Sequence, residues 1–297
     1  MVKGPKIALM GCGLWGRNIL RDLIALGCEV AVIDPSAESR DQALRMGATT
    51  AVSDAAEVEN AAGIIVASPA SAHVGCIEAI LDRGVPIFCE KPLCQSVVEN
   101  ERLAAVARGR LFEMHIWRYH PGVEKLAALL RAGELGEPLW LKSTRVNWTS
   151  PRKDVDPVWT LAPHDLSIVL EVLGAMPRPK AAIAERLHGK AVGLAGVMEG
   201  PVPFLLDVST RHREKRREVR LHGSRGIAVL NDDRLIVNLG GDDVDVPFEK
   251  DVPPLQRQLK AFLDHVHAGT ALRSSMTDSR AVLVALTQLR ELAGLAA

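Results

Sequence analysis

The 297-residue chain has no excess of charge of either sign, because 36 Lys and Arg residues balance 36 Asp and Glu residues. Proteins that attract nucleic acid or anionic membranes usually carry a net positive charge. The densest basic run, residues 211–220, also holds two Glu residues and is typical of a strand with a solvated or subunit-facing side. We therefore expect neither nucleic acid nor a membrane as a partner.

Cysteine patterns and long hydrophobic runs are also missing. The five Cys residues are odd in number, form no CxxC pair and have no His at the spacing of a zinc site. No stretch approaches the ~20 apolar residues of a membrane span. The apolar run after Lys6 is too short for a signal peptide and is broken by Gly11 and Gly13. These absences favour a cytoplasmic protein without a metal site.

Aromatic residues are scarce, at 4%, whereas hydrophobic residues make up 47% of the chain. Such a composition favours aliphatic cores built from helices and parallel strands. The length suits two domains better than one, because single cores stop growing near roughly 250–300 residues.

The first part of the chain alternates short apolar runs with helical patterns. We expect strands at 6–10, 29–33, 48–52, 63–67, 85–89 and 111–116, and helices at 16–26, 37–46, 71–83 and 96–108. This alternation predicts an α/β domain with a parallel sheet covered on both faces.

The pattern changes after a boundary that we place near residue 118. Helices are expected at 121–132, 163–173, 254–267 and 277–294, and strands at 138–148, 180–188, 190–199, 203–211, 215–222, 225–230 and 234–239. Closely spaced strands joined by Gly, Pro and Asp turns predict an antiparallel sheet. We thus expect a Rossmann domain at 1–118 and an α+β domain at 119–297, whose last helices can pack back on the first domain.

The first expected strand leads into a glycine loop, Gly11-Cys-Gly-Leu-Trp-Gly16, which opens the first helix. The G-x-G-x-x-G pattern is weak alone, but this strand–helix setting is the one that dinucleotide binding requires. Gly11 permits the tight turn, Gly13 lets the backbone approach a pyrophosphate, and Gly16 lets helix and strand pack closely. Leu14 and Trp15 complete the loop. The helix N-terminus favours the phosphates.

Asp34 ends the second expected strand, where a carboxylate can accept hydrogen bonds from the adenosine ribose. The same charge repels a 2′-phosphate, so NAD is favoured over NADP. The alternative is that Asp34 only caps the helix that follows Pro35.

Several segments together resemble the Gfo/Idh/MocA family, the glucose–fructose oxidoreductase and inositol dehydrogenase group. Besides the glycine loop they are ASPASAH at 67–73, CEKPL at 89–93, RYHP at 118–121, GELG at 133–136 and WTLAPHD at 159–165. The resemblance implies a Rossmann domain, a second domain with a large open antiparallel sheet, and a homodimer or homotetramer formed through that sheet. It also implies hydride transfer between NAD and a sugar or cyclitol carbinol.

Finer motifs resemble a nucleotide-sugar dehydrogenase branch of the same family. Trp15, Asn18 and Arg21 match one form of the glycine loop, and residues 159–168 match the segment around its histidine. Arg217 with the turn at 223–226 matches a strand-turn of these proteins.

The resemblance also assigns site residues. Lys91 in the E-K-P motif is the catalytic lysine, and His164, at the expected helix start after Pro163, passes the proton. The residues expected to line the cofactor also include Ser68, Pro69, His73 and Glu90. For His73, which starts a helix, the alternative is a surface residue without a role in binding. The residues considered for the substrate are Arg118, Trp148, Thr160 and Asp165, of which Asp165 can instead cap the helix or orient the histidine.

Thr160 departs from the family, which often has Asp four residues before this histidine. A hydroxyl carries no charge and cannot raise the basicity of Lys91 or His164 as a carboxylate would. A non-catalytic sensor or scaffold that binds the cofactor therefore stays an alternative, as does an NADPH-dependent carbonyl reductase, which Asp34 disfavours.

Two groups of residues have either a substrate-binding or a structural role, and the sequence does not decide between them. Ser143, Arg145 and Asn147 share one face of an expected strand and can meet the substrate or a sheet interface. Trp117, Trp148 and Trp159 fit core packing as well as sugar stacking.

Overall fold

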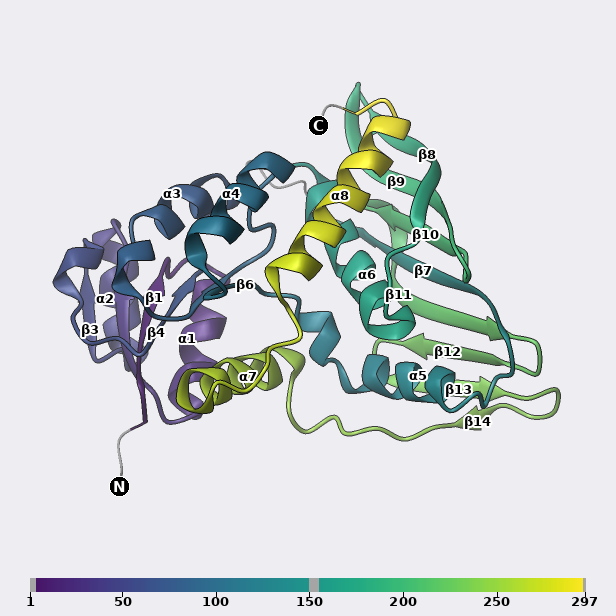
Figure 1. Cartoon of the computed structure of the whole chain (residues 1–297), viewed down its shortest axis with the longest axis horizontal. Helices are drawn as coiled ribbons and strands as arrows, with labels where there is room; N and C mark the ends of the chain where they lie inside the picture. The colour runs from purple at the N-terminus through teal and green to yellow at the C-terminus, as the bar shows by residue number, and fades with distance from the viewer. Residues whose placement is uncertain (1–3, 150–154, 296–297) are drawn as a thin grey trace. The chain divides into compact units, whose positions relative to one another are not determined.

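The computed structural model describes residues 4–149 and 155–295. The chain divides into two compact units, Met1–Met114 with Pro253–Arg280 and His115–Val252 with Ala281–Ala297. Helix α8 (Met276–Leu292) thus contributes to both units (Figure 1). Among the described residues, no helix is long and apolar enough to cross a bilayer.

The first unit is built on a six-stranded parallel sheet with the order β3-β2-β1-β4-β5-β6. The strands are β1 (Lys6–Met10), β2 (Glu29–Ile33), β3 (Thr50–Val52), β4 (Gly63–Val66), β5 (Ile87–Cys89) and β6 (Leu111–Glu113). Continuous burial of β4 and β5 fits strands covered on both faces. This order is that of the Rossmann fold, so the expected parallel domain is confirmed.

Helices α1 (Gly16–Ala25), α2 (Ala37–Arg45), α3 (His73–Glu78), α4 (Val97–Ala107) and α7 (Pro254–Ala268) accompany this sheet. Phe262 of α7 stacks on Phe88 of β5 with ring centroids 5.0 Å apart, so α7 belongs to this core. The helix expected at 71–83 is shorter than predicted: α3 lies between 3₁₀ turns at Ala70–Ala72 and Leu81–Arg83. Arg83 donates to the Val58 and Ala55 carbonyl oxygens, which fixes the last turn.

The second unit contains an eight-stranded sheet with the order β14-β13-β12-β11-β7-β10-β9-β8. Its strands are β7 (Pro138–Trp148), β8 (Arg178–Leu187), β9 (Lys190–Glu199), β10 (Phe204–Ser209), β11 (Arg211–Gly223), β12 (Ile227–Asn231), β13 (Arg234–Asn238) and β14 (Val244–Asp245). The large sheet is confirmed, but it is mixed, since β7 and β10 pair in parallel. A long connection through α6 (Pro157–Leu173), β8 and β9 separates these two strands, which permits the parallel pairing.

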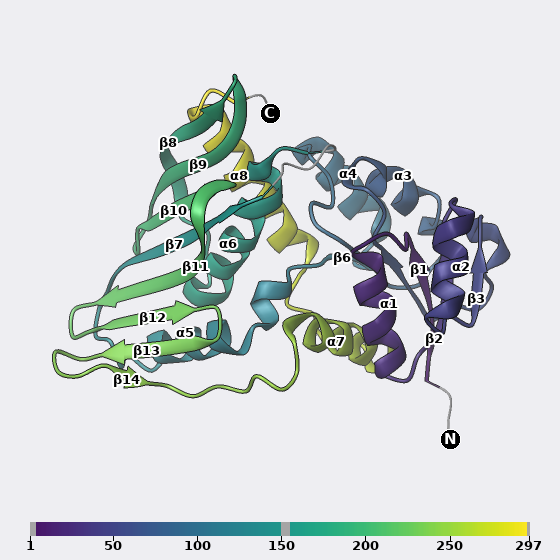
Figure 2. The ribbon, with the colours of Figure 1, turned by 180° about the vertical axis from the view of Figure 1, so that it is seen from behind.

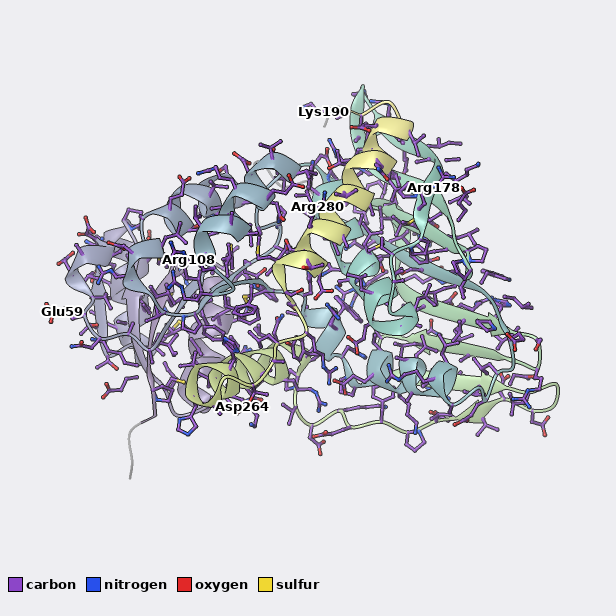
Figure 3. The ribbon with its side chains drawn as sticks, viewed as in Figure 1. Glu59, Arg108, Arg178, Lys190, Asp264 and Arg280 are labelled. Atoms are coloured by element: carbon purple, nitrogen blue, oxygen red, sulfur yellow. The ribbon has the colours of Figure 1, made fainter. Side chains whose placement is uncertain are left out.

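Helices α5 (Pro121–Arg131) and α6 lie on one face of this sheet with part of α8, and no described helix covers the other face (Figures 1 and 2). Charged side chains such as Glu59, Arg178 and Lys190 point outward (Figure 3), whereas the cores are aliphatic.

Helix α6 begins at Pro157 rather than at residue 163. The Asp156 carboxylate caps it, since Oδ1 accepts hydrogen bonds from the backbone N–H groups of Val158 and Trp159 at 2.9 and 3.2 Å. Proline suits the first helical position, so Pro157 supports this start. The expectation that His164 stands at a helix start, and that Asp165 caps the helix, was therefore wrong. His164 lies inside α6.

Candidate active site

The glycine loop joins β1 to α1 in a conformation that only glycine tolerates. Gly11 has φ +94°, and a Cβ there would lie 2.6 Å from the Ser68 backbone nitrogen. A Cβ at Gly16 would lie 2.2 Å from the Gly11 carbonyl oxygen. At Gly13, by contrast, no described atom lies within 4 Å of such a Cβ, so this side of the loop is open. The loop thus offers bare backbone to a ligand, as a pyrophosphate requires.

The start of α1 suits an anion. Within the described chain, α1 has no side-chain cap and no acidic residue in its first turn, so its positive dipole end is uncompensated. Leu14 and Trp15 project from the loop with 87% and 42% of their surface exposed.

Asp34 connects the end of β2 to the glycine loop. Its Oδ2 accepts a hydrogen bond from the Cys12 backbone N–H at 2.8 Å, and its Oδ1 accepts one from the Ser36 N–H at 2.9 Å. The following helix is capped by Ser36, not by Asp34. A carboxylate has about four acceptor directions, so two bonds leave capacity for ribose hydroxyls.

Glu90 follows β5 and lies buried beside the glycine loop. Its Oε1 accepts a hydrogen bond from the Trp15 indole Nε1, and its Oε2 accepts one from the Lys91 backbone N–H at 3.1 Å. Burial raises the pKa of this carboxyl group, and the Lys91 charge and the Trp15 bond oppose that rise. Glu90 therefore joins the loop to the residue that carries the lysine.

His73 joins the segments around the expected cofactor site. It begins α3 and is 1% exposed, so it is not a surface residue. Its Nδ1 lies 2.8 Å from the Pro92 carbonyl oxygen and its Nε2 lies 2.9 Å from that of Ser68. Pro69 lies between Ser68 and the turn that precedes α3. The imidazole thus links the residue that follows Lys91 to Ser68.

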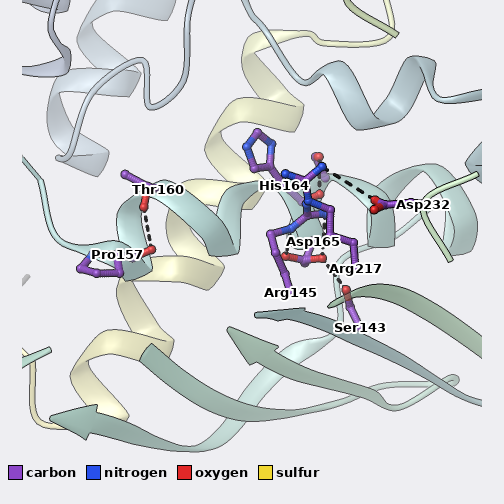
Figure 4. A network of polar contacts seen from close by, with 9 residues as sticks. Ser143, Arg145, Pro157, Thr160, His164, Asp165, Arg217 and Asp232 are labelled. Carbon is purple, nitrogen blue, oxygen red and sulfur yellow. Dashed lines mark hydrogen bonds and ion pairs between the residues drawn. The ribbon is translucent and has the colours of Figure 1, made fainter. Parts of the chain in front are cut away.

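In the second unit, Thr160 and His164 lie one turn apart on α6 and share a face. The Thr160 hydroxyl donates to the Pro157 carbonyl oxygen at 2.9 Å, and the Ser167 hydroxyl donates to that of His164 at 2.7 Å. His164 is partly exposed (Figure 4).

Asp165 is fully buried and binds strand β7. Its Oδ2 accepts from Arg145 Nε at 2.7 Å, and its Oδ1 accepts from Arg145 Nη2 at 3.2 Å and from the Ser143 hydroxyl. Figure 4 shows these groups together beneath α6. The carboxylate holds α6, and so His164, against the sheet.

The other residues considered for substrate binding, and the tryptophans, each contact a different charged partner. Arg118 Nε donates to Glu171 Oε2 at 3.2 Å in a largely buried ion pair. Trp148 is 66% exposed and lies under the Arg211 guanidinium. Trp117 lies under Arg145, whereas the buried Trp159 lies under Arg290.

Sequence reasoning missed the contacts of Glu90 with Trp15 and of Asp34 with Cys12, since each joins distant residues. It also missed the role of Arg145 as the partner of Asp165. The only sequence signal was the placement of Ser143 and Arg145 on one face. Among the described residues, no group of His, Cys, Asp and Glu fits a metal ion.

Comparison with known proteins agrees with the interpretation of the glycine loop as part of a dinucleotide-binding domain. Residues 5–114 match the model of the oxidoreductase family with an NAD-binding Rossmann fold. The inositol 2-dehydrogenase of Streptomyces avermitilis is 32% identical over 49% of this chain and 46% of its own length. That of Burkholderia vietnamiensis is 26% identical over 94% of this chain and 91% of its own. The chain spans less than half the length of the first of these relatives.

Solved structures extend the likeness to the whole fold. UDP-N-acetylglucosamine 3-dehydrogenase from Acidithiobacillus ferrooxidans superposes with a TM-score of 0.87 at 24% identity, over 98% of both chains. Levoglucosan dehydrogenase in complex with NADH and levoglucosan gives 0.87 at 16% identity, over 98% of this chain and 97% of its own. Such identities show a shared fold. Residues 5–114 therefore resemble the NAD-binding Rossmann domain of the Gfo/Idh/MocA oxidoreductase family, and the chain shares the fold of these solved structures.

Proposed function

We propose that this protein is an NAD-dependent oxidoreductase that acts on the CH–OH group of a sugar, cyclitol or nucleotide sugar. The glycine loop and Asp34 together carry the proposal, because the loop suits the pyrophosphate of a dinucleotide and Asp34 suits its adenosine ribose. The relatives that are named as inositol, levoglucosan and UDP-N-acetylglucosamine dehydrogenases support the substrate class.

Residues of the first unit would hold the cofactor. The loop at Gly11, Gly13 and Gly16 would take the pyrophosphate, and Asp34 the adenosine ribose. The remaining cofactor residues would be Leu14, Trp15, Ser68, Pro69, His73, Glu90 and Lys91. When bound, NAD supplies the hydride acceptor at its nicotinamide ring.

Lys91 and His164 would handle the proton. Oxidation of a carbinol requires removal of its hydroxyl proton, and Lys91 Nζ would bind the reacting oxygen and stabilise its developing negative charge. His164 would pass the proton onward, since an imidazole can accept a proton on one ring nitrogen and donate one from the other. Glu90 and His73 would act as positioning residues, because both bind the backbone around Lys91. Thr160 would supply only a hydroxyl near His164.

The preference for NAD rests on the Asp34 charge, which opposes a 2′-phosphate. Arg40 lies close by, but its guanidinium donates to the carbonyl oxygens of Asp34 and Pro35 at 2.8 and 2.9 Å. The Arg40 guanidinium is therefore engaged with the backbone rather than held ready for a 2′-phosphate.

The open sheet face supports self-association. Ile183 and Val197 expose 76% and 44% of their surface on it, and Trp140 stacks on His222 with ring centroids 3.8 Å apart. We assign this face to a homodimer or homotetramer.

A non-catalytic cofactor-binding protein is the second candidate, favoured by the Thr160 hydroxyl, which is bonded to its own helix. Incubation with NAD and inositols, free sugars and UDP-sugars, followed by NADH absorbance at 340 nm, tests the two. Turnover supports the oxidoreductase, whereas tight NAD binding without turnover of any carbinol supports the second candidate.

A further inference from the structure

Two arginines end the helix-facing row of strands β7 and β11. The register pairs Leu141 with Leu221, Ser143 with Val219 and Arg145 with Arg217. Directly opposite residues point to the same face of a sheet. The row therefore passes from a buried apolar pair to two guanidinium groups at one end.

Two like charges directly opposite each other are unfavourable unless other groups offset them. The charge of Arg145 is balanced by Asp165, to which it forms an ion pair at 2.7 Å. Both side chains of this pair are buried, with 6% and 0% of their surface exposed. The Trp117 ring lies under both guanidinium groups, with its centroid 4.4 Å from Cζ of Arg145 and 5.9 Å from that of Arg217.

Arg217 has no comparable partner in the described part of the chain. Its ion pair with Asp232 is 3.7 Å long, beyond hydrogen-bond distance, and Lys215 shares that carboxylate at 3.6 Å. Burial and the neighbouring Arg145 charge lower the pKa of Arg217, and the Asp232 and Asp165 carboxylates only partly oppose that decrease. Yet 39% of its side chain is exposed, so a ligand can reach it.

A chain of contacts links Arg217 to α6, the helix that carries His164. Arg145, directly opposite in the register, binds Asp165, and Asp165 follows His164 on α6. Figure 4 shows Arg217 in this network, with its contact to Asp232 drawn as a dashed line. A group bound at Arg217 would therefore lie in the same network as the His164 turn.

We propose that Arg217 recognises an oxyanion of the substrate, a carboxylate or a phosphate ester. A guanidinium presents paired donors that match both groups, and the Trp117 ring lies beneath this one. The inference rests on the proposed function and narrows its substrate class to an anionic carbinol, such as a sugar acid or a phosphorylated sugar.

Isothermal titration of the NAD-loaded protein with D-glucose, D-glucuronate and D-glucose 6-phosphate tests this inference. Wild type should bind an anionic sugar at least about 10-fold more tightly than glucose. Arg217→Gln should remove that preference, and Arg217→Lys should keep part of it. The comparison of glucuronate with the phosphate identifies which oxyanion is recognised.

Arg216→Gln is the matched control, because Arg216 neighbours Arg217, faces the other side of the sheet and pairs with Glu218 at 2.8 Å. It should leave the preference unchanged, and thermal melting of each variant should confirm that it is folded. Wild type without a preference for the anionic sugars, or Arg217→Gln with the wild-type preference, would overturn the inference. Selective binding without NADH formation would instead count against the proposed function alone.

Discussion

The Trp15 indole donates a hydrogen bond to the Glu90 carboxylate, and this bond links the glycine loop to the residue before Lys91. The two residues are far apart in sequence, and each belongs to a motif with a different expected task. Their contact suggests that the phosphate-binding loop and the segment that carries the lysine hold each other in place.

Trp15→Phe should weaken NAD binding by roughly 3- to 30-fold, the range expected for one hydrogen bond to a carboxyl group. Fluorescence or calorimetric titration of NAD measures this, with Trp148→Phe, an exposed tryptophan in the second unit, as the control. Equal NAD affinity in Trp15→Phe and wild type would show that the contact has no role in binding.

The same substitution should change the response of stability to pH. Burial raises the pKa of Glu90 above that of an unfolded carboxyl group. Its stabilising contribution is therefore full below the unfolded value of 4.5 and is lost as pH rises through the higher folded value. Without the Trp15 bond the folded pKa rises further, so Trp15→Phe should lose more stability than wild type between mildly acidic and neutral pH.

Asp34→Ser should lower NAD affinity by about 10-fold or more and reduce the discrimination against NADP. The variant loses both the ribose acceptor and the charge that repels a 2′-phosphate. Titration of both dinucleotides measures the ratio, with Asp41→Ser on the exposed side of α2 as the control. Unchanged NAD affinity would defeat the assignment of Asp34 to the cofactor.

Thr160→Asp should shift the acid limb of the pH–rate profile to higher pH. A carboxylate one turn before His164 favours the protonated imidazole, so more alkaline solution is needed to deprotonate it. Thr160→Asn, which has the same shape without the charge, should leave the limb in place. Coincident profiles for the two variants would show that the charge at this position does not reach the reacting proton.

His120 should limit stability in acid. Burial lowers its pKa to about 4, and its Nδ1 accepts a hydrogen bond from the Gly122 N–H at 3.1 Å, which requires the unprotonated nitrogen. Asp232, Arg145 and Glu124 also influence this group. Because the folded pKa lies below the unfolded 6.5, the contribution is full above 6.5 and is lost as pH falls towards 4.

His120→Asn keeps an N-cap for α5 but removes the titration. Thermal melting between pH 4 and 7 should therefore show a flatter acid limb for this variant than for wild type. Parallel curves for the two proteins would assign the acid sensitivity to other groups.

Much of the fold followed from local patterns. Apolar runs such as Gly63–Val66 and the glycine loop define the parallel domain because their periods and turns act within a few residues. The start of α6 was missed for two reasons. The residues that follow its cap, Asp156, lack the apolar spacing of a helix, and the internal Pro163 resembles the first residue of a helix. The parallel pairing of β7 with β10 depends on a crossover that spacing alone does not encode.

Site chemistry was less accessible to sequence than the fold. The residue types at Asp34, Lys91 and His164 indicate their tasks, but the environment of each depends on distant partners. Asp165 shows this most clearly: next to the histidine in sequence, it turns into the sheet to pair with Arg145. Likewise, the environment of Arg217 depends on the register between β7 and β11.

The central claim, that Lys91 handles the proton of a carbinol oxidised by NAD, is tested most directly by single-turnover NADH formation in wild type and Lys91→Ala. With a carbinol that wild type oxidises, we expect the variant to bind NAD within a few-fold of wild type and to lose roughly 100- to 10,000-fold in rate. A variant that forms NADH at the wild-type rate would contradict the claim.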